Sequence, residues 1–113
     1  MNVFVVDEDP EAAARALHDD HLGKMLIESA QLLCTALWSH GVAAPYRPTH
    51  EGHPCAVWTR STRDNFRWLG LYAASLATEY EHRFVRSHAS ARVAELAVGL
   101  GLMRGGEEDE LRA

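Results

Sequence analysis

Residues 17–40 read LHDDHLGKMLIESAQLLCTALWSH, and this stretch decides the fold class. We interpret it as a helix from about His21 to His40, capped at its start by Asp19 and Asp20 and ended by Gly41. Five of its polar residues follow one another at spacings of three and four, namely His21, Lys24, Glu28, Gln31 and Thr35. They therefore share one face, and apolar residues border them. A narrow polar line with apolar borders is typical of a cleft wall.

A second long stretch repeats this arrangement. Ser61 and Thr62 are candidate caps for a helix that runs to about Arg86. One face of it carries Asn65, Trp68, Tyr72, Ser75, Glu79, His82 and Arg86. If the two lines face each other, Glu28 lies in a sheltered groove beside aromatic and hydrogen-bonding groups. The structural alternative is that Lys24 and Glu28 form an ordinary i, i+4 pair on a solvated helix.

The remaining chain also indicates helices. Asp9-Pro10 begins a short one, and His53-Pro54 begins another after the loop 41–48. Ser87 or Ser90 is expected to open a last helix, which the pair Gly105-Gly106 ends. The first six residues are expected to form a short extended segment across the helices. We therefore predict an all-α domain of about five helices over 1–106, with a frayed acidic tail over 107–113.

Composition limits the functional classes. The chain has 113 residues, of which 47% are hydrophobic and 24% are charged, which excludes a disordered protein. It lacks an apolar run long enough to span a membrane, a basic leader and a set of cysteines for a disulfide framework, so we expect a cytoplasmic protein. The formal net charge is −5, yet residues 21–92 hold eight basic and five acidic residues, a net charge of +3. This balance permits contact with nucleic acid without predicting it.

Two histidine pairs with equal spacing offer an alternative. His18 and His21 form one HxxH pair, and His50 and His53 form the other, so together they are candidate zinc ligands. Such pairs also arise by chance, and we favour a helix-end hydrogen bond for His53. Cys55 beside His53 or His50 is a candidate nucleophile, although a small buried cysteine is the commoner case. Our leading expectation is a protein without a bound metal or other cofactor.

Several short motifs together resemble the pyrimidine dimer DNA glycosylases, which include a phage-type endonuclease V-like glycosylase and lyase. His21-Leu22 precedes Glu28 by seven residues, as a His-Leu pair precedes the catalytic glutamate of that family. Gly52-His53 leads into a helix, and Trp58 follows. The stretch 49–55 is similar to the Thr-His-x-x-His-Pro-Cys of small phage and bacterial members. The resemblance covers about residues 1–85 and implies an all-helical fold.

The resemblance also implies a chemistry, which is base excision in DNA repair. In that family the α-amine of the first residue attacks the sugar C1′, displaces the base and forms an imine, after which β-elimination breaks the strand. An α-amine is less basic than a lysine, so more of it is neutral and nucleophilic at pH 7. Glu28 is the implied acid and base, with Lys24 and His21 as neighbours and Met1 as the nucleophile. Arg60, Arg63 and Arg67 are candidates for contacts with DNA phosphates, and a solvated helix face is their structural alternative.

Further residues complete the expected site. We expect DNA or a nucleoside-like molecule to contact seven residues: Asn2, Gln31, His53, Asn65, Trp68, Tyr72 and Arg63. The sequence differs from the family at three places, which implies a changed substrate. Asn2 follows Met1 where the family exposes a threonine, Ile27 and Gln31 stand at its arginine positions, and the tail is acidic.

Two other functions stay open from the sequence. One is a binding module without catalysis, in which Trp58, Trp68 and Tyr72 contact a small molecule or a peptide. The other is a zinc enzyme that uses the histidine pairs. Neither the substrate nor the oligomeric state follows from the sequence.

Overall fold

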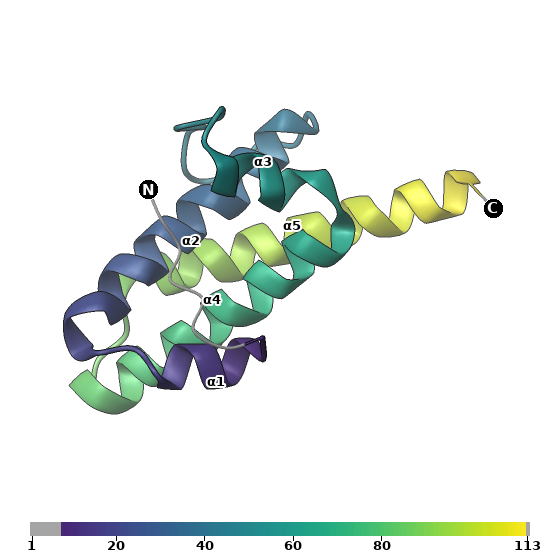
Figure 1. Cartoon of the computed structure of the whole chain (residues 1–113). Coiled ribbons are helices and arrows are strands. Elements are labelled where there is room, and N and C mark those ends of the chain that lie inside the picture. Colours follow the sequence, from purple (N-terminus) through teal and green to yellow (C-terminus); the bar gives the residue numbers. More distant parts are fainter. Residues whose placement is uncertain (1–7, 113) are drawn as a thin grey trace.

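Helix α2 (Asp19–Ser39) lies along one side of α4 and α5 and supplies much of the core of the molecule (Figure 1). The computed structural model describes residues 8–112, with side chains as far as Leu102, so the extended segment expected at 1–6 lies outside the described residues. The fully buried large side chains of α2 are Leu22, Met25, Leu26, Leu32 and Leu33. Each contributes about 1.5–3 kcal/mol by leaving water. These side chains anchor α2 against α3, α4 and α5.

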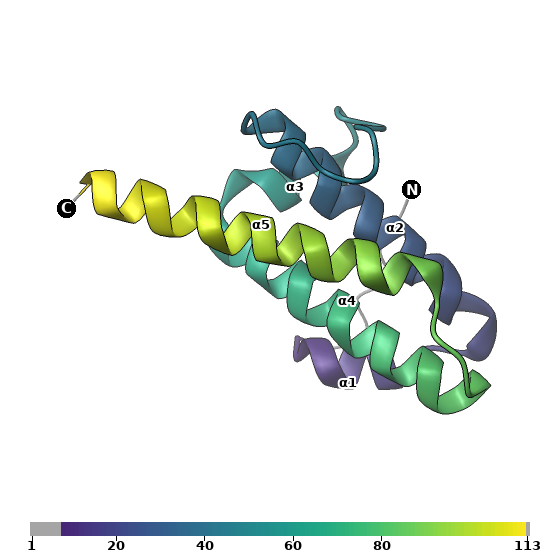
Figure 2. The ribbon, with the colours of Figure 1, turned by 180° about the vertical axis from the view of Figure 1, so that it is seen from behind.

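The chain forms four other helices, and the all-α prediction is confirmed because the described residues contain no strand. They are α1 (Pro10–Arg15), α3 (Pro54–Ser61), α4 (Arg63–Phe84) and α5 (Ala89–Arg112). Helix α1 packs on α4, whereas α3 packs on α2 and α4. Helices α4 and α5 lie side by side, and the far end of α5 extends past the other helices (Figure 2). The resulting molecule measures 43 × 26 × 25 Å.

Most helix starts follow the predicted capping residues. Asp9 accepts a hydrogen bond from the Ala12 N–H at 3.2 Å, with Pro10 at the first helical position. His53 Nδ1 accepts from the Cys55 N–H at 3.1 Å, so its predicted helix-end role is confirmed. Thr62 Oγ1 accepts from the Asn65 N–H at 3.0 Å. At the other end of α2, Gly41 has φ = +78°, a conformation that costs glycine little.

Three predicted helix ends are wrong. The cap of α2 is His18, whereas Asp19 and Asp20 lie in the first turn, where their charge favours the helix dipole. Neither Ser87 nor Ser90 caps α5, because His88 Nδ1 accepts from the Ser90 N–H at 3.0 Å. Helix α5 also continues through the glycine pair at 105–106. Glycine costs only about 1 kcal/mol in a helix, and the residues that follow are helix formers. The frayed tail at 107–113 stays a prediction.

Arg83 holds the end of α1 and the start of α2 against α4. Its guanidinium donates to the Arg15 carbonyl at 2.9 Å, the Leu17 carbonyl at 2.6 Å and Asp19 Oδ1 at 3.0 Å. It also donates to Glu79 Oε1 at 2.9 Å, one turn earlier on α4. The hydrogen bond to Glu79 is the main reason that the pKa of Arg83 is raised. A single side chain thus satisfies carbonyls that the end of α1 leaves open.

Candidate functional site

Glu28 is the residue of the α2 polar line whose environment is least ordinary. Its side chain is half-buried, and its Oε2 atom is buried without a hydrogen-bond partner among the described residues. The next residue, Ser29, is fully buried, and its Oγ atom also lacks a partner. Buried polar atoms in native proteins are nearly always paired, and the exceptions call for an explanation. For Glu28 and Ser29 the described residues do not supply that pairing.

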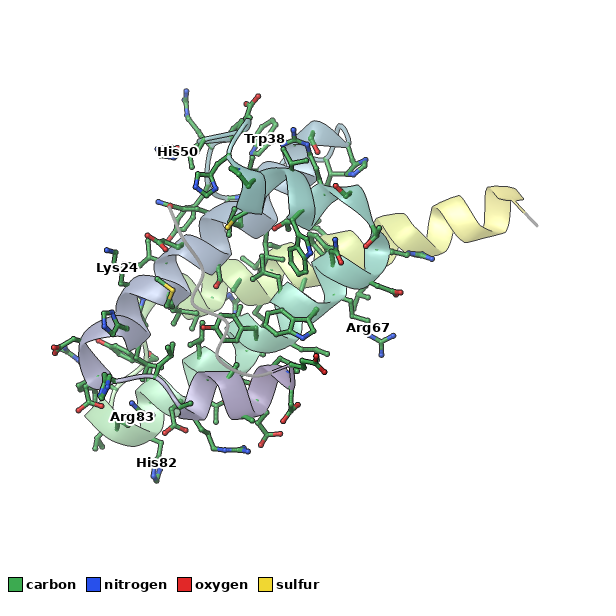
Figure 3. The ribbon with its side chains drawn as sticks, in the orientation of Figure 1. Lys24, Trp38, His50, Arg67, His82 and Arg83 are labelled. Atoms are coloured by element: carbon green, nitrogen blue, oxygen red, sulfur yellow. The ribbon has the colours of Figure 1, made fainter. Side chains whose placement is uncertain are left out.

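The neighbours of Glu28 along the line differ in exposure. Lys24 is exposed, extends away from α2 and makes no ion pair with Glu28 (Figure 3). The ion pair between Lys24 and Glu28, which the sequence offered as the structural alternative, is therefore not present. His21 is half-buried, with its ring 6.4 Å from that of His18. Thr35 is buried and bonds to the backbone of Thr49.

The line on α4 contributes an aromatic stack. Trp68 stacks on Tyr72 with ring centroids 5.2 Å apart, and Trp58 of α3 meets Trp68 edge to face at 6.2 Å. Exposure falls along this series, from 43% for Trp58 to none for Tyr72. Burial raises the pKa of Tyr72 to about 12, so it stays a neutral phenol. The ring of Trp58 is therefore open to solvent, while the buried ring of Tyr72 packs against Trp68.

Other members of the α4 line hold the fold together. Asn65 Nδ2 donates to the Trp58 carbonyl at 2.8 Å and so fixes α3 against α4. Glu79 pairs with Arg83. Arg63, at the start of α4, is exposed, as are His82 and Arg86. Helices α2 and α4 pack directly on each other, and the members of the two lines that are fully buried are Thr35 and Tyr72.

Gln31 lies one turn beyond Glu28 and lines a separate hollow of about 490 Å³. The loop 42–50 forms one wall, held by Trp38, whose Nε1 donates to the Tyr46 carbonyl at 2.8 Å. The Tyr46 hydroxyl and Ser90 Oγ lie 2.8 Å apart and join this loop to α5. Sequence reasoning missed both residues, since they are distant along the chain. The predicted roles of Gln31, Asn65, Trp68, Tyr72, Arg63 and His53 in substrate binding stay predictions.

The two histidine pairs do not come together. His50 lies next to Thr49, which bonds Thr35 of α2. Thr35 is 14 residues beyond His21, which is about 21 Å along a helix. Figure 3 shows His50 near the top of the view and Arg83, the partner of Asp19, near the bottom. Among the described residues no three His, Cys, Asp or Glu side chains are placed to hold a metal ion. The Cys55 contact with His53 involves the backbone N–H, not the thiol.

The remaining two predicted site residues, Met1 and Asn2, lie outside the described residues. The described chain begins beside the aromatic stack, because Trp68 Nε1 donates to the Glu8 carbonyl at 2.8 Å. Within the described part of the chain, no helix is long and apolar enough to cross a membrane.

Comparison with known proteins supplies the family. The family model described as pyrimidine dimer DNA glycosylase matches residues 1–92, a range that contains α1 to α4 and the start of α5. Neither the curated proteins nor the solved structures contain a match to this chain. The matched range includes Glu28 and the whole α2 polar line. The chain therefore belongs to the pyrimidine dimer DNA glycosylase family.

Proposed function

We propose that the protein removes a base from DNA and that Glu28 is its acid and base. The family indicates a DNA glycosylase-type function. The observation that carries the assignment of Glu28 is its buried Oε2 atom, which has no hydrogen-bond partner in the part of the chain that the structure describes. Leaving such an atom unpaired costs about 1–3 kcal/mol. A cost of this kind is often retained where the unpaired group meets a substrate.

The reaction follows the chemistry of an amine nucleophile. The nitrogen of the first residue forms a bond to C1′ of the sugar, while the bond from C1′ to the base breaks and its electron pair leaves with the base. The base takes up a proton, and the nitrogen loses one. Opening of the sugar ring then gives an imine and a hydroxyl on C4′. β-Elimination removes a proton from C2′ and breaks the bond between C3′ and the phosphate oxygen, so the downstream strand leaves with a 5′ phosphate. Glu28 supplies and accepts the protons in these steps.

The position of Glu8 supports the amine as the nucleophile. Glu8 lies against Trp68 on α4, which packs directly on α2. Seven extended residues span up to about 24 Å. Packed helix axes lie about 8–10 Å apart. The length of the chain before Glu8 therefore permits the proposed reaction between the first residue and a base held at Glu28.

Trapping with borohydride tests the proposal. The full chain is incubated with duplex DNA that contains an abasic site or a pyrimidine dimer, and borohydride reduces any imine to a stable adduct. We expect an adduct whose tryptic map places the DNA on the first residue. Glu28→Gln should slow strand cleavage at least about a hundredfold. The matched control is Glu51→Gln, which replaces an exposed glutamate between the loop 42–50 and α3 and should cleave at the wild-type rate. Unchanged DNA without an adduct would refute the lyase reaction.

A binding module without catalysis is the second candidate, and the exposed edge of the aromatic stack favours it. Trp58 presents its ring to solvent and rests on Trp68. Such a platform takes a planar ligand by stacking. In that case a nucleoside would quench tryptophan fluorescence, Trp58→Ala would abolish the quenching, and Glu28→Gln would change affinity without any turnover to lose.

A further inference from the structure

The outer face of α4 and α5 forms an apolar groove separate from the candidate site. Its volume is about 850 Å³. Small residues line its middle and one end, including Ala74, Ala77 and Ala91, whereas larger ones stand toward the other end. Among the larger ones, Leu71 is 51% exposed and Leu102 is 62% exposed. Contiguous exposed apolar surface of this kind marks an interaction site.

Two glycines set the register between the helices that form the groove. A methyl group on Gly70 of α4 would lie 2.8 Å from Val98 of α5, and one on Gly101 would overlap the ring of Phe66. Gly70 is therefore level with Val98, and Phe66 is level with Gly101. The chain turns back between the two helices, as both views show, so they are antiparallel (Figures 1 and 2). This register places Ala74 level with Ala94 at the centre of the groove.

Four charged residues of the groove are arranged symmetrically about this centre. Arg67 and Glu81 each lie seven residues from Ala74 on α4, about 10 Å to either side. On α5, the midpoint between Arg92 and Glu95 lies within one residue of Ala94. All four are exposed, and none forms an ion pair with a described residue. Arg67 extends away from the molecule (Figure 3).

We propose that a second copy of this chain covers this groove as a twofold dimer. The axis crosses α4 and α5 at right angles at the level of Ala74 and Ala94. This operation lays each helix antiparallel on its counterpart. Arg67 then faces Glu81 of the partner subunit, and Arg92 faces Glu95 of the partner subunit. A single axis thus pairs all four charges, as an isologous interface requires.

The shape of the groove fits the same axis. The operation brings Leu71 over Ala77 of the partner subunit, so the half with larger side chains packs on the half with small ones. Four antiparallel helices then share one apolar layer, as in a helix bundle. The charges also favour a second copy over nucleic acid, because two arginines are balanced by two glutamates. A surface that binds phosphates carries a basic excess.

Sedimentation equilibrium of the full chain tests the dimer by charge reversal. The wild type should dimerise with increasing concentration. Arg67→Glu and Glu81→Arg should each raise the dimer dissociation constant at least about tenfold, since both symmetry-related pairs become repulsive. An equimolar mixture of the two variants should form heterodimers, because each unlike pair is restored. The double variant should dimerise like the wild type. The control, Arg47→Glu, reverses an exposed arginine of the loop 42–50 and should have no effect.

The mixture separates this proposal from a loss of folding, because an unfolded variant would not associate with its complement. A wild-type chain that stays monomeric at its highest soluble concentration would overturn the proposal and leave the groove to another occupant. Dimers that survive both reversals, or a mixture that stays monomeric, would overturn it as well.

Discussion

Replacing Glu28 with methionine should stabilise the protein and abolish its activity. Methionine keeps the length of the side chain and removes the oxygen that is buried with no hydrogen bond to any described residue. The fold no longer carries the cost of that oxygen, while the proposed reaction loses its acid and base. Functional residues are often kept at a cost in stability, so replacing one commonly stabilises the fold while activity is lost.

The expected magnitude follows from the partial burial of Glu28. An unpaired buried polar group costs about 1–3 kcal/mol. Since only part of this side chain is buried, we expect a gain near the lower limit, about 1 kcal/mol. The entropy of unfolding is about 2.1 cal/mol/K per residue, which gives roughly 0.2 kcal/mol/K for this domain. The midpoint Tm should therefore rise by about 4–5 °C in a thermal melt followed by circular dichroism.

Glu79 provides the matched control, because it is a glutamate of a neighbouring helix with a partner. Glu79→Met loses the hydrogen bond to Arg83 and should lower the Tm by about 5 °C. Both substitutions replace a glutamate with a methionine, yet Glu28→Met should raise the Tm and Glu79→Met should lower it. If Glu28→Met leaves the Tm unchanged or lowers it, the side chain is solvated or paired, and the reasoning for the site fails.

Three further changes test other parts of the structure. Arg83→Met removes the hydrogen bonds to Arg15, Leu17, Asp19 and Glu79. It should lower the free energy of unfolding by about 3 kcal/mol, measured by chemical denaturation. A decrease of less than about 1 kcal/mol would contradict the role of these hydrogen bonds. Val85→Gly should stabilise by about 1 kcal/mol, because Val85 ends α4 at φ = 54°, where a β-branched residue is strained, whereas Val85→Ala should gain less. Burial, and secondly Arg86, lower the pKa of His88 from 6.5. Protonation therefore favours the unfolded chain, and stability should fall as the pH drops from 6.5 through the lowered pKa. His88→Asn keeps a side-chain oxygen that can cap α5 and removes the titrating group. The free energy of unfolding should therefore depend less on pH below 6.5 in this variant. An unchanged slope would show that other groups cause the pH dependence.

Helix starts were predictable where the signal is local. Asp9-Pro10, His53-Pro54 and Thr62 each act within one turn, and the structure places a cap at each. The prediction failed where two candidates competed. His18 takes the extended conformation before α2, which leaves Asp19 in the first turn and within reach of Arg83. The glycine pair near the end of α5 failed as a stop because glycine weakens a helix without forbidding it.

The sequence predicted which residues lie on the polar line of α2, but it did not predict their burial or their hydrogen bonds. The spacing of three and four placed Glu28 on a polar line of α2, and the family match covers that line. Only packing shows that Lys24 faces solvent, that Tyr72 is fully buried and that Oε2 of Glu28 lacks a partner. Gln31 was predicted beside Glu28, yet it lines a hollow whose other walls come from the loop 42–50 and α5.

The sequence by itself determined five helices, most of their starts and the face of α2 that carries Glu28, because capping and periodicity act between residues a few positions apart. The tertiary structure decided which atoms lose water and which charges find partners. Those properties depend on side chains that meet from distant parts of the chain, as Arg83 meets Leu17 and Tyr46 meets Ser90. Burial belongs to a packed arrangement of helices and not to any one of them, so the unpaired oxygen of Glu28 is visible only in the folded molecule.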